Sequence, residues 1–136
     1  MRMQQDRPVV ASRTFPAHPS ALFPVRQFVR EQAADVRLSL AATDDLVLAV
    51  SEACANCLHH TSSREFTLRW RALPDRVVVE VADRGVFLER MPLPDAGAEA
   101  GRGIALMMAV IDEVEFRKGT SRRPGTVVRL VKYRRD

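Results

Sequence analysis

The fold of this chain is decided by a segment near its middle, residues 46–61, which reads LVLAVSEACANCLHHT. Apolar side chains recur there at intervals of three and four residues, the period of an amphipathic helix. We expect this helix to begin at Thr43 or Asp44, either of which can cap it, and to end near His60. Asp44 and Asp45 then fall in its first turn, where the helix dipole favours negative charge. The apolar face is formed by Leu46, Val50, Ala53, Cys54, Cys57 and Leu58.

A different face of the same helix is polar. It carries Glu52, Asn56, His59 and His60, which are spaced so that they share one side of the helix. Carboxylate, amide and imidazole groups are costly to bury without partners. Two interpretations therefore stay open on these residues alone: a functional site, or the ordinary solvent-exposed face of an amphipathic helix.

The rest of the chain predicts five strands and two further helices. The strands are expected at residues 9–15, 64–72, 76–83, 114–118 and 126–133. Ser20 is expected to cap a first helix that fades near Ala34, and the connector over residues 36–42 is expected to bury Leu38 and Leu40. The third helix is expected to open with residues 101–103. This order predicts an α+β chain folded as a two-layer α/β sandwich, with a mixed, mostly antiparallel sheet and helices on one face.

Composition narrows the class of protein further. The chain has 136 residues, 28% of them charged, which indicates one globular domain over residues 1–136. No apolar run is long enough to cross a bilayer and no secretory signal is visible, so we expect a soluble, cytoplasmic protein that binds no membrane. Two cysteines provide no disulfide framework.

The net charge of +4 arises from basic residues that gather late in the chain, between Arg117 and Arg135. A nucleic-acid interface would need exposed aromatic residues or a reading helix among them, so we expect no nucleic-acid partner. A solvated strand edge and attraction to an acidic protein partner both remain open.

Two glycine-containing motifs accompany the polar helix face. Asp83 ends a hydrophobic strand and is followed by Gly85, a pattern that can accept from a purine amino group and admit a flat ligand, although it also occurs in plain turns. Gly101-Arg102-Gly103 opens a helix, where free backbone N–H groups and the helix dipole favour phosphate. Between the motifs lies a long loop of weak periodicity, of a length that is usually functional or disordered.

Taken together and in this order, these pieces resemble the histidine-kinase-like (GHKL) ATPase superfamily, and within it the anti-sigma-factor serine kinases of the stress-response and sporulation type. The matching segments are SEACANCLHH, ADRG, GRGIALM and GTVVRLVK, which span nearly the whole chain. The resemblance implies a Bergerat-type ATP-binding fold, ATP and Mg²⁺ as cofactors, and a homodimer. It also implies two protein partners: a sigma factor, and a STAS-type anti-anti-sigma factor that is phosphorylated on serine.

The resemblance also implies a role for each matching residue. Asn56 matches the asparagine that coordinates Mg²⁺, and Glu52 matches the general base that takes the proton of the substrate serine. The loop over residues 86–100 matches the ATP lid, and His60 stands where the family often has a histidine, with a structural role. The remaining nucleotide-binding positions, for the adenine and the phosphates, are Asp83, Gly85, Gly101, Arg102, Gly103 and Thr126.

The chain departs from the family pattern in two places. Phe87 stands where the adenine motif usually has a second glycine, so a nucleotide-dependent protein-binding regulator without kinase activity is the alternative function. Cys54 and Cys57 flank Asn56; zinc binding and redox pairing are weaker interpretations than small buried thiols, because both cysteines lie on the apolar face. We also expect a partner surface on the first helix, with Arg26 and Arg30 beside Phe28 and Val29, unless this is its ordinary solvent-exposed face.

Overall fold

The computed structural model describes residues 8–60, 64–83, 102–119 and 125–134, and these form one sheet with helices packed against it. The strands agree with the sequence prediction to within a residue or two at each end, because alternation marks strand residues clearly. The elements are β1 (Val9–Pro16), the 3₁₀ turn η1 (Pro19–Ala21), α2 (Leu22–Asp35), α3 (Leu40–His60), β2 (Glu65–Ala72), β3 (Arg76–Asp83), α4 (Arg102–Val110), β4 (Glu113–Lys118) and β5 (Thr126–Tyr133).

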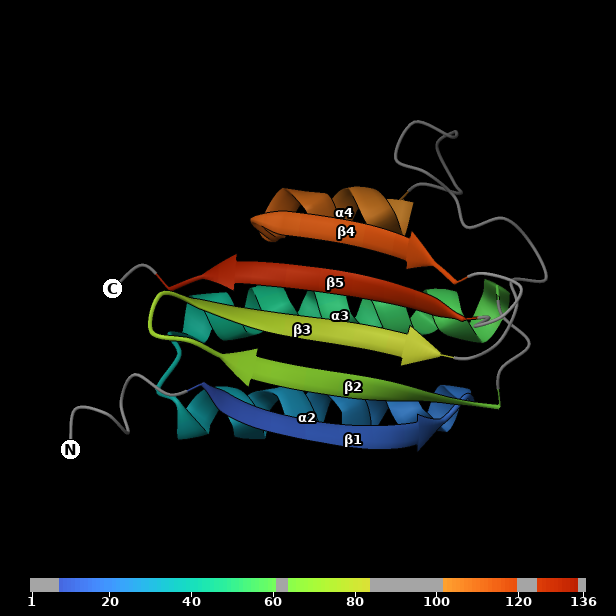
Figure 1. Ribbon diagram of the computed structural model, residues 1–136, viewed down its shortest axis with the longest axis horizontal. Coiled ribbons are helices and arrows are strands. Elements are labelled where there is room, and N and C mark those ends of the chain that lie inside the picture. Colours follow the sequence, from blue (N-terminus) through green and yellow to red (C-terminus); the bar gives the residue numbers. More distant parts are fainter. Residues whose placement is uncertain (1–7, 61–63, 84–101, 120–124, 135–136) are drawn as a thin grey trace.

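The five strands lie in the order β1-β2-β3-β5-β4, and each neighbouring pair within the described ranges is antiparallel. The helices cover one face of this sheet, as Figure 1 shows. The predicted α+β two-layer sandwich is confirmed, and the sheet is wholly antiparallel over these strands rather than mixed. Strand β4 lies at the edge of the sheet, and β5 lies between β4 and β3. Because β5 runs antiparallel to β3, the start of β5 lies next to the end of β3.

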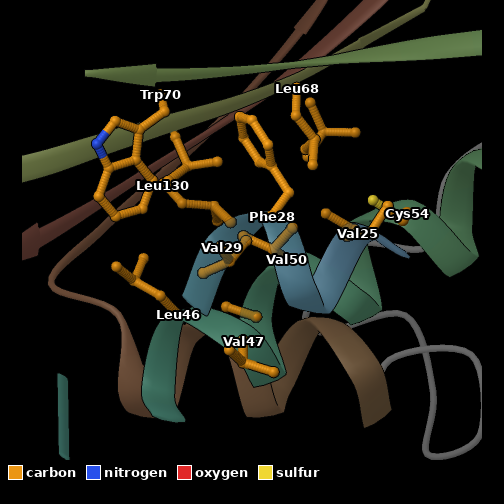
Figure 2. Close-up of a cluster of buried hydrophobic side chains, with 14 of the residues drawn as sticks. Val25, Phe28, Val29, Leu46, Val47, Val50, Cys54, Leu68, Trp70 and Leu130 are labelled. Carbon is orange, nitrogen blue, oxygen red and sulfur yellow. The ribbon is translucent and has the colours of Figure 1, made fainter. Parts of the chain in front are cut away.

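The core lies between the sheet and helices α2 and α3 (Figure 2). Val25, Phe28 and Val29 enter it from α2, and Trp70 covers it from β2. Strand β3 is central in the sheet; on its outer face Val78 and Ala82 are nearly inaccessible, whereas Arg76 and Glu80 are half-buried. The core face of β3 carries Val77, Val79 and Val81, which are inaccessible to water.

Both helix starts differ from the prediction. Ser20 lies inside the 3₁₀ turn, and Ala21 precedes α2 without a side-chain cap. Helix α3 begins a turn earlier than expected, at Leu40, because the Oγ of Ser39 accepts a hydrogen bond from the backbone N–H of Ala42 at 3.2 Å. Leu40 is consequently 81% exposed, whereas Leu38 is buried as predicted.

Two further sequence predictions are wrong. One placed Asp44 and Asp45 in the first turn of helix α3, and the other placed Phe28 and Val29 on an exposed partner surface. With α3 starting at Leu40, Asp44 and Asp45 lie beyond its first turn, and Asp44 pairs with Arg30 of α2 at 3.1 Å. Phe28 and Val29 face the core, so the exposed arginines of α2 do not share a surface with them. No helix within the described ranges combines the length and apolarity that a bilayer crossing requires.

Candidate functional site

The best-defined polar cluster joins the end of β3 to the start of β5. Asp83 and Thr126 are paired in the antiparallel register of these two strands. The Thr126 hydroxyl donates a hydrogen bond to the Asp83 carboxylate, with 2.7 Å between Oγ1 and Oδ2. Both residues are buried: the exposed fraction is 7% for Asp83 and 5% for Thr126. A buried carboxylate needs such donors, so the sequence-predicted pair forms one polar site inside the apolar framework.

Helix α3 contributes a third member to this cluster. The thiol of Cys57 on this helix is buried, and its pKa is raised in part by Asp83, through charge and hydrogen bonding. Burial raises the pKa of Cys57, and the negative charge of Asp83 raises it further. Since a hydrogen bond that stabilises the protonated thiol has the S–H group as its donor, Asp83 is the acceptor.

Sequence reasoning predicted Cys57 to be a small buried thiol and did not predict its interaction with Asp83. Its burial is confirmed, and burial raises the pKa of Cys54 as well. Both thiols therefore keep their protons near neutral pH, whereas metal ligation and thiol exchange use the thiolate. The position of Cys57 in the sequence could have indicated its interaction with Asp83, because Cys57 directly follows Asn56 and lies on the face of α3 that packs under the sheet.

Glu52 and Asn56 are separated by one turn of α3, and both are half-buried. Among the described residues, the Nδ2 atom of Asn56 is buried and has no hydrogen-bond partner. The amide nitrogen of Asn56 is therefore less accessible than it would be on a fully exposed helix face. The backbone of His60 forms the last residue of α3, and the His59 and His60 side chains lie outside the described part of the chain.

Two of the three predicted phosphate-binding residues lie at the start of α4. Arg102 and Gly103 are its first two residues, while Gly85, Gly101, Phe87 and the predicted lid over residues 86–100 fall outside the described residues. Figure 1 shows that the C-terminal ends of α3 and β3 and the N-terminal ends of α4 and β5 lie at the same end of the molecule. The fold therefore gathers the elements that carry the predicted site at one end of the sheet.

A half-buried lysine holds α4 in place beside α3. The Lys132 ammonium lies 2.9 Å from the Asp45 carboxylate of α3 and donates to the Val110 carbonyl at the end of α4, at 2.7 Å. Arg134 likewise donates to the carbonyls of Val36 and Leu73. These two basic residues form hydrogen bonds within the fold, whereas Arg117 lies on the edge strand β4 and fits the solvated-edge interpretation.

A helix-covered antiparallel sheet, with an amide and a carboxylate on one helix and a buried aspartate at the neighbouring strand end, defines a domain of the α+β class. The chain belongs to the family described as the histidine kinase-like ATPase domain, which matches residues 15–132. This match covers most of the chain and includes β2, β3, α4 and the candidate residues of α3 and β5.

Curated relatives and a solved structure agree with this family. The chain is 31% identical over 119 residues to the anti-sigma F factor of Caldanaerobacter subterraneus subsp. tengcongensis, covering 79% of this chain and 82% of the relative. It is 28% identical over 134 residues to the serine-protein kinase RsbW of Bacillus subtilis, covering 87% and 81% respectively. The crystal structure of the RsbU and RsbW domains of a Mycobacterium tuberculosis protein is similar in fold, with a TM-score of 0.73 at 21% identity. That match covers 94% of this chain and 33% of the solved one, so this chain spans about a third of its length.

Proposed function

We propose that this protein is an ATP-dependent protein-serine kinase and anti-sigma factor. It binds ATP with Mg²⁺, phosphorylates a STAS-type anti-anti-sigma partner on serine, and sequesters a sigma factor as a homodimer. The printed names of the relatives, anti-sigma F factor and serine-protein kinase, support this pair of activities. The observation that carries the proposal is the buried Asp83–Thr126 pair at the same end of the sheet as the Asn56-bearing part of α3.

The nucleotide is assigned to residues on three elements and the loop before α4. Asp83 accepts the hydrogen bond of the adenine amino group, with Thr126 and Gly85 beside the base. The backbone N–H groups of Gly101 and Gly103 receive the phosphates at the helix N-terminus, and Arg102 adds positive charge. This arrangement selects a purine with an amino substituent and a chain of phosphates.

Asn56 is the assigned protein ligand of Mg²⁺. The chemistry of the side chain fits the ion, because an amide oxygen is a hard donor and Mg²⁺ retains several waters beside one or two protein ligands. The unpartnered Nδ2 of Asn56 supports the assignment, since no described protein group fixes the amide in another role. When bound, Mg²⁺ neutralises phosphate charge.

Glu52 is the assigned general base of the transfer. The serine oxygen of the partner forms a bond to the γ-phosphorus of ATP while the bond between that phosphorus and the bridging oxygen breaks, which leaves ADP. The proton of the serine hydroxyl passes to the Glu52 carboxylate. The half-buried Glu52 carboxylate lies one turn before Asn56 on the same side of α3, which supports this assignment.

A second candidate function is a nucleotide-dependent regulator that binds its partner without transferring phosphate. Phe87, in place of the usual glycine, favours it. ATP would then shift the population of protein conformations that bind the partner. Both functions require ATP binding, and only the first requires Glu52.

The decisive experiment measures phosphate transfer and ATP binding in parallel. The purified chain is incubated with radiolabelled ATP, Mg²⁺ and a serine-bearing anti-anti-sigma protein, and ATP affinity is measured by calorimetry. Glu52→Ala should lower the transfer rate by roughly 10²–10⁴-fold, as expected for a lost general base, while the Kd for ATP stays nearly constant. Asn56→Ala should weaken magnesium-dependent ATP binding itself.

Glu115→Gln is the matched control, because Glu115 forms an exposed ion pair with Arg117 on the edge strand and should affect neither readout. The Bacillus subtilis serine-protein kinase with its own substrate serves as the positive control for transfer. ATP binding without transfer would favour the regulator over the kinase. Absence of any magnesium-dependent ATP binding would refute both functions.

A further inference from the structure

Lys132 joins the two neighbouring helices α3 and α4 through one charged group. It lies on the helix-facing side of β5, because its register partner Val77 on β3 points into the core. Its ammonium lies 2.9 Å from the Asp45 carboxylate of α3 and donates to the carbonyl of Val110, the last residue of α4, at 2.7 Å. Because the lysine side chain is 16% exposed, water competes weakly for these charge-assisted bonds.

Helix α4 is held loosely by its own side chains. Of its residues 105–110, whose side chains the structure describes, Met107 is the one that is fully buried, whereas Leu106 and Met108 are 47% and 50% exposed. A helix with one buried side chain depends on the bonds at its ends for its orientation. The Lys132 ammonium supplies such a bond at the C-terminal end, where the helix dipole also favours a cation.

This link lies at the opposite end of both helices from the proposed nucleotide site. The C-terminal end of α3 and the N-terminal end of α4 lie at the same end of the molecule, so the two helices run antiparallel (Figure 1). Asp45 lies about 16 Å before Asn56 along α3, and Val110 lies about 12 Å after Arg102 along α4. A helix moves as a rigid rod over such lengths, so a tilt at Val110 displaces the backbone N–H groups at Arg102.

We propose that Lys132 is a positioning residue for the nucleotide phosphates, which fixes the start of α4 relative to Asn56 of α3. This inference rests on the proposed binding of phosphates at α4 and of Mg²⁺ at Asn56. The same phosphates must reach both helices at once, so the spacing of the helices decides how many of these bonds form together. The adenosine part is assigned to Asp83 and Thr126, between two strands, and does not depend on this spacing.

The test compares the Kd values of ATP and adenosine, each with Mg²⁺, in NMR titrations of the full chain. The ratio of the adenosine Kd to the ATP Kd measures the contribution of the phosphates. Lys132→Met keeps the length of the side chain but removes the ammonium, and it should lower this ratio by roughly 10-fold, the effect of one lost charge-assisted hydrogen bond. The adenosine Kd itself should stay within about 2-fold of the wild-type value.

Two further variants separate positioning from general loss of stability. Lys132→Arg retains a cation with several donors and should restore the ratio to within about 3-fold of the wild-type value. Asp45→Asn weakens the link to α3 while Lys132 keeps its bond to Val110, so the ratio should fall by about 2–5-fold. Because Asp45→Asn is the milder change, it decides the question if Lys132→Met does not fold.

Arg134 provides the matched control. It also donates to two backbone carbonyls, that of Leu73 at 3.0 Å and that of Val36 at 2.6 Å, and neither carbonyl belongs to α3 or α4. Arg134→Met should lower stability in urea and leave the ratio within about 2-fold of the wild-type value.

Two results would overturn this inference. One is an unchanged ratio in Lys132→Met and Asp45→Asn, and the other is an equal fall of the ratio in Arg134→Met. In either case, ATP binding by the wild type would still support the proposed function. Failure of the wild type to bind ATP would overturn both.

Discussion

At the scale of single residues, Asp83 shows how much of the site could be predicted. Its place at the end of an apolar strand is visible in the sequence, and so is the threonine that begins the last strand, 43 residues later. The hydrogen bond between them follows from strand register, which requires the sheet order. The influence of Asp83 on the pKa of Cys57 could not be predicted, because the rotation of α3 against the sheet is set by packing across the whole core.

Thr126→Val tests the contribution of this hydrogen bond to stability. Valine has nearly the same shape as threonine but no hydroxyl, so Asp83 loses one donor while remaining buried. We expect the free energy of unfolding to fall by about 1–3 kcal/mol, the usual cost of depriving a buried polar group of its partner. Urea denaturation measures it. Thr126→Ser keeps the donor and should lose less; an unchanged midpoint for Thr126→Val would contradict this account.

At the scale of elements, strands were more predictable than helix starts. Each strand can be recognised in the sequence by alternating apolar and polar residues or by a run of β-branched residues. By contrast, several residues near a helix start can act as the cap. Thr43 and Asp44 are good caps in isolation, yet Ser39 takes that role. The reason is tertiary: Leu38 is drawn into the core, and Asp44 is engaged by Arg30 of the neighbouring helix.

The corrected start of α3 predicts unequal effects of two substitutions. Ser39→Ala removes the acceptor for the backbone N–H of Ala42 and should lower the free energy of unfolding by about 0.5–2 kcal/mol. Asp44→Ala removes one side of an exposed ion pair and should cost less, about 0–1 kcal/mol. Thermal unfolding followed by circular dichroism compares the two variants. A larger loss of stability for Asp44→Ala than for Ser39→Ala would contradict the cap at Ser39 and favour the one predicted from the sequence at Asp44.

At the scale of the whole molecule, one core supports the site from below. Aromatic contacts join β1, β2 and α2: the ring of Phe15 stacks on Phe66 at 5.8 Å and meets Phe28 edge-on at 6.2 Å. The Cys54 and Cys57 thiols belong to the same continuous core, so their exposure to water requires α3 to separate from the sheet. The two thiols therefore report on opening of this core.

Burial of the thiols also predicts how stability depends on alkaline pH. The pKa of both thiols is raised in the folded state above the ordinary value of 9.0, so the folded protein retains protons that the unfolded chain releases. The free energy of unfolding should therefore be steady below about pH 8 and fall as pH rises through 9, by up to about 1.4 kcal/mol per pH unit for each thiol.

Denaturant titrations between pH 7 and pH 9.5 measure this slope. The double variant Cys54→Ala/Cys57→Ala should be less stable at neutral pH because it loses core volume, but its stability should decline less in this pH interval. Rapid modification of the native thiols by a small thiol reagent at pH 8 would contradict the burial that the prediction assumes.

The sequence by itself determined the α+β class, the five strands, the family resemblance and most of the candidate residues, because local periodicity and short motifs encode them. Tertiary structure decided which residues meet. It placed Thr126 against Asp83, joined Lys132 to α3 and α4, and moved the start of α3 to Leu40. The physical reason is that contacts between distant segments depend on strand order and on how side chains fill the shared core, and neither is encoded in local pattern.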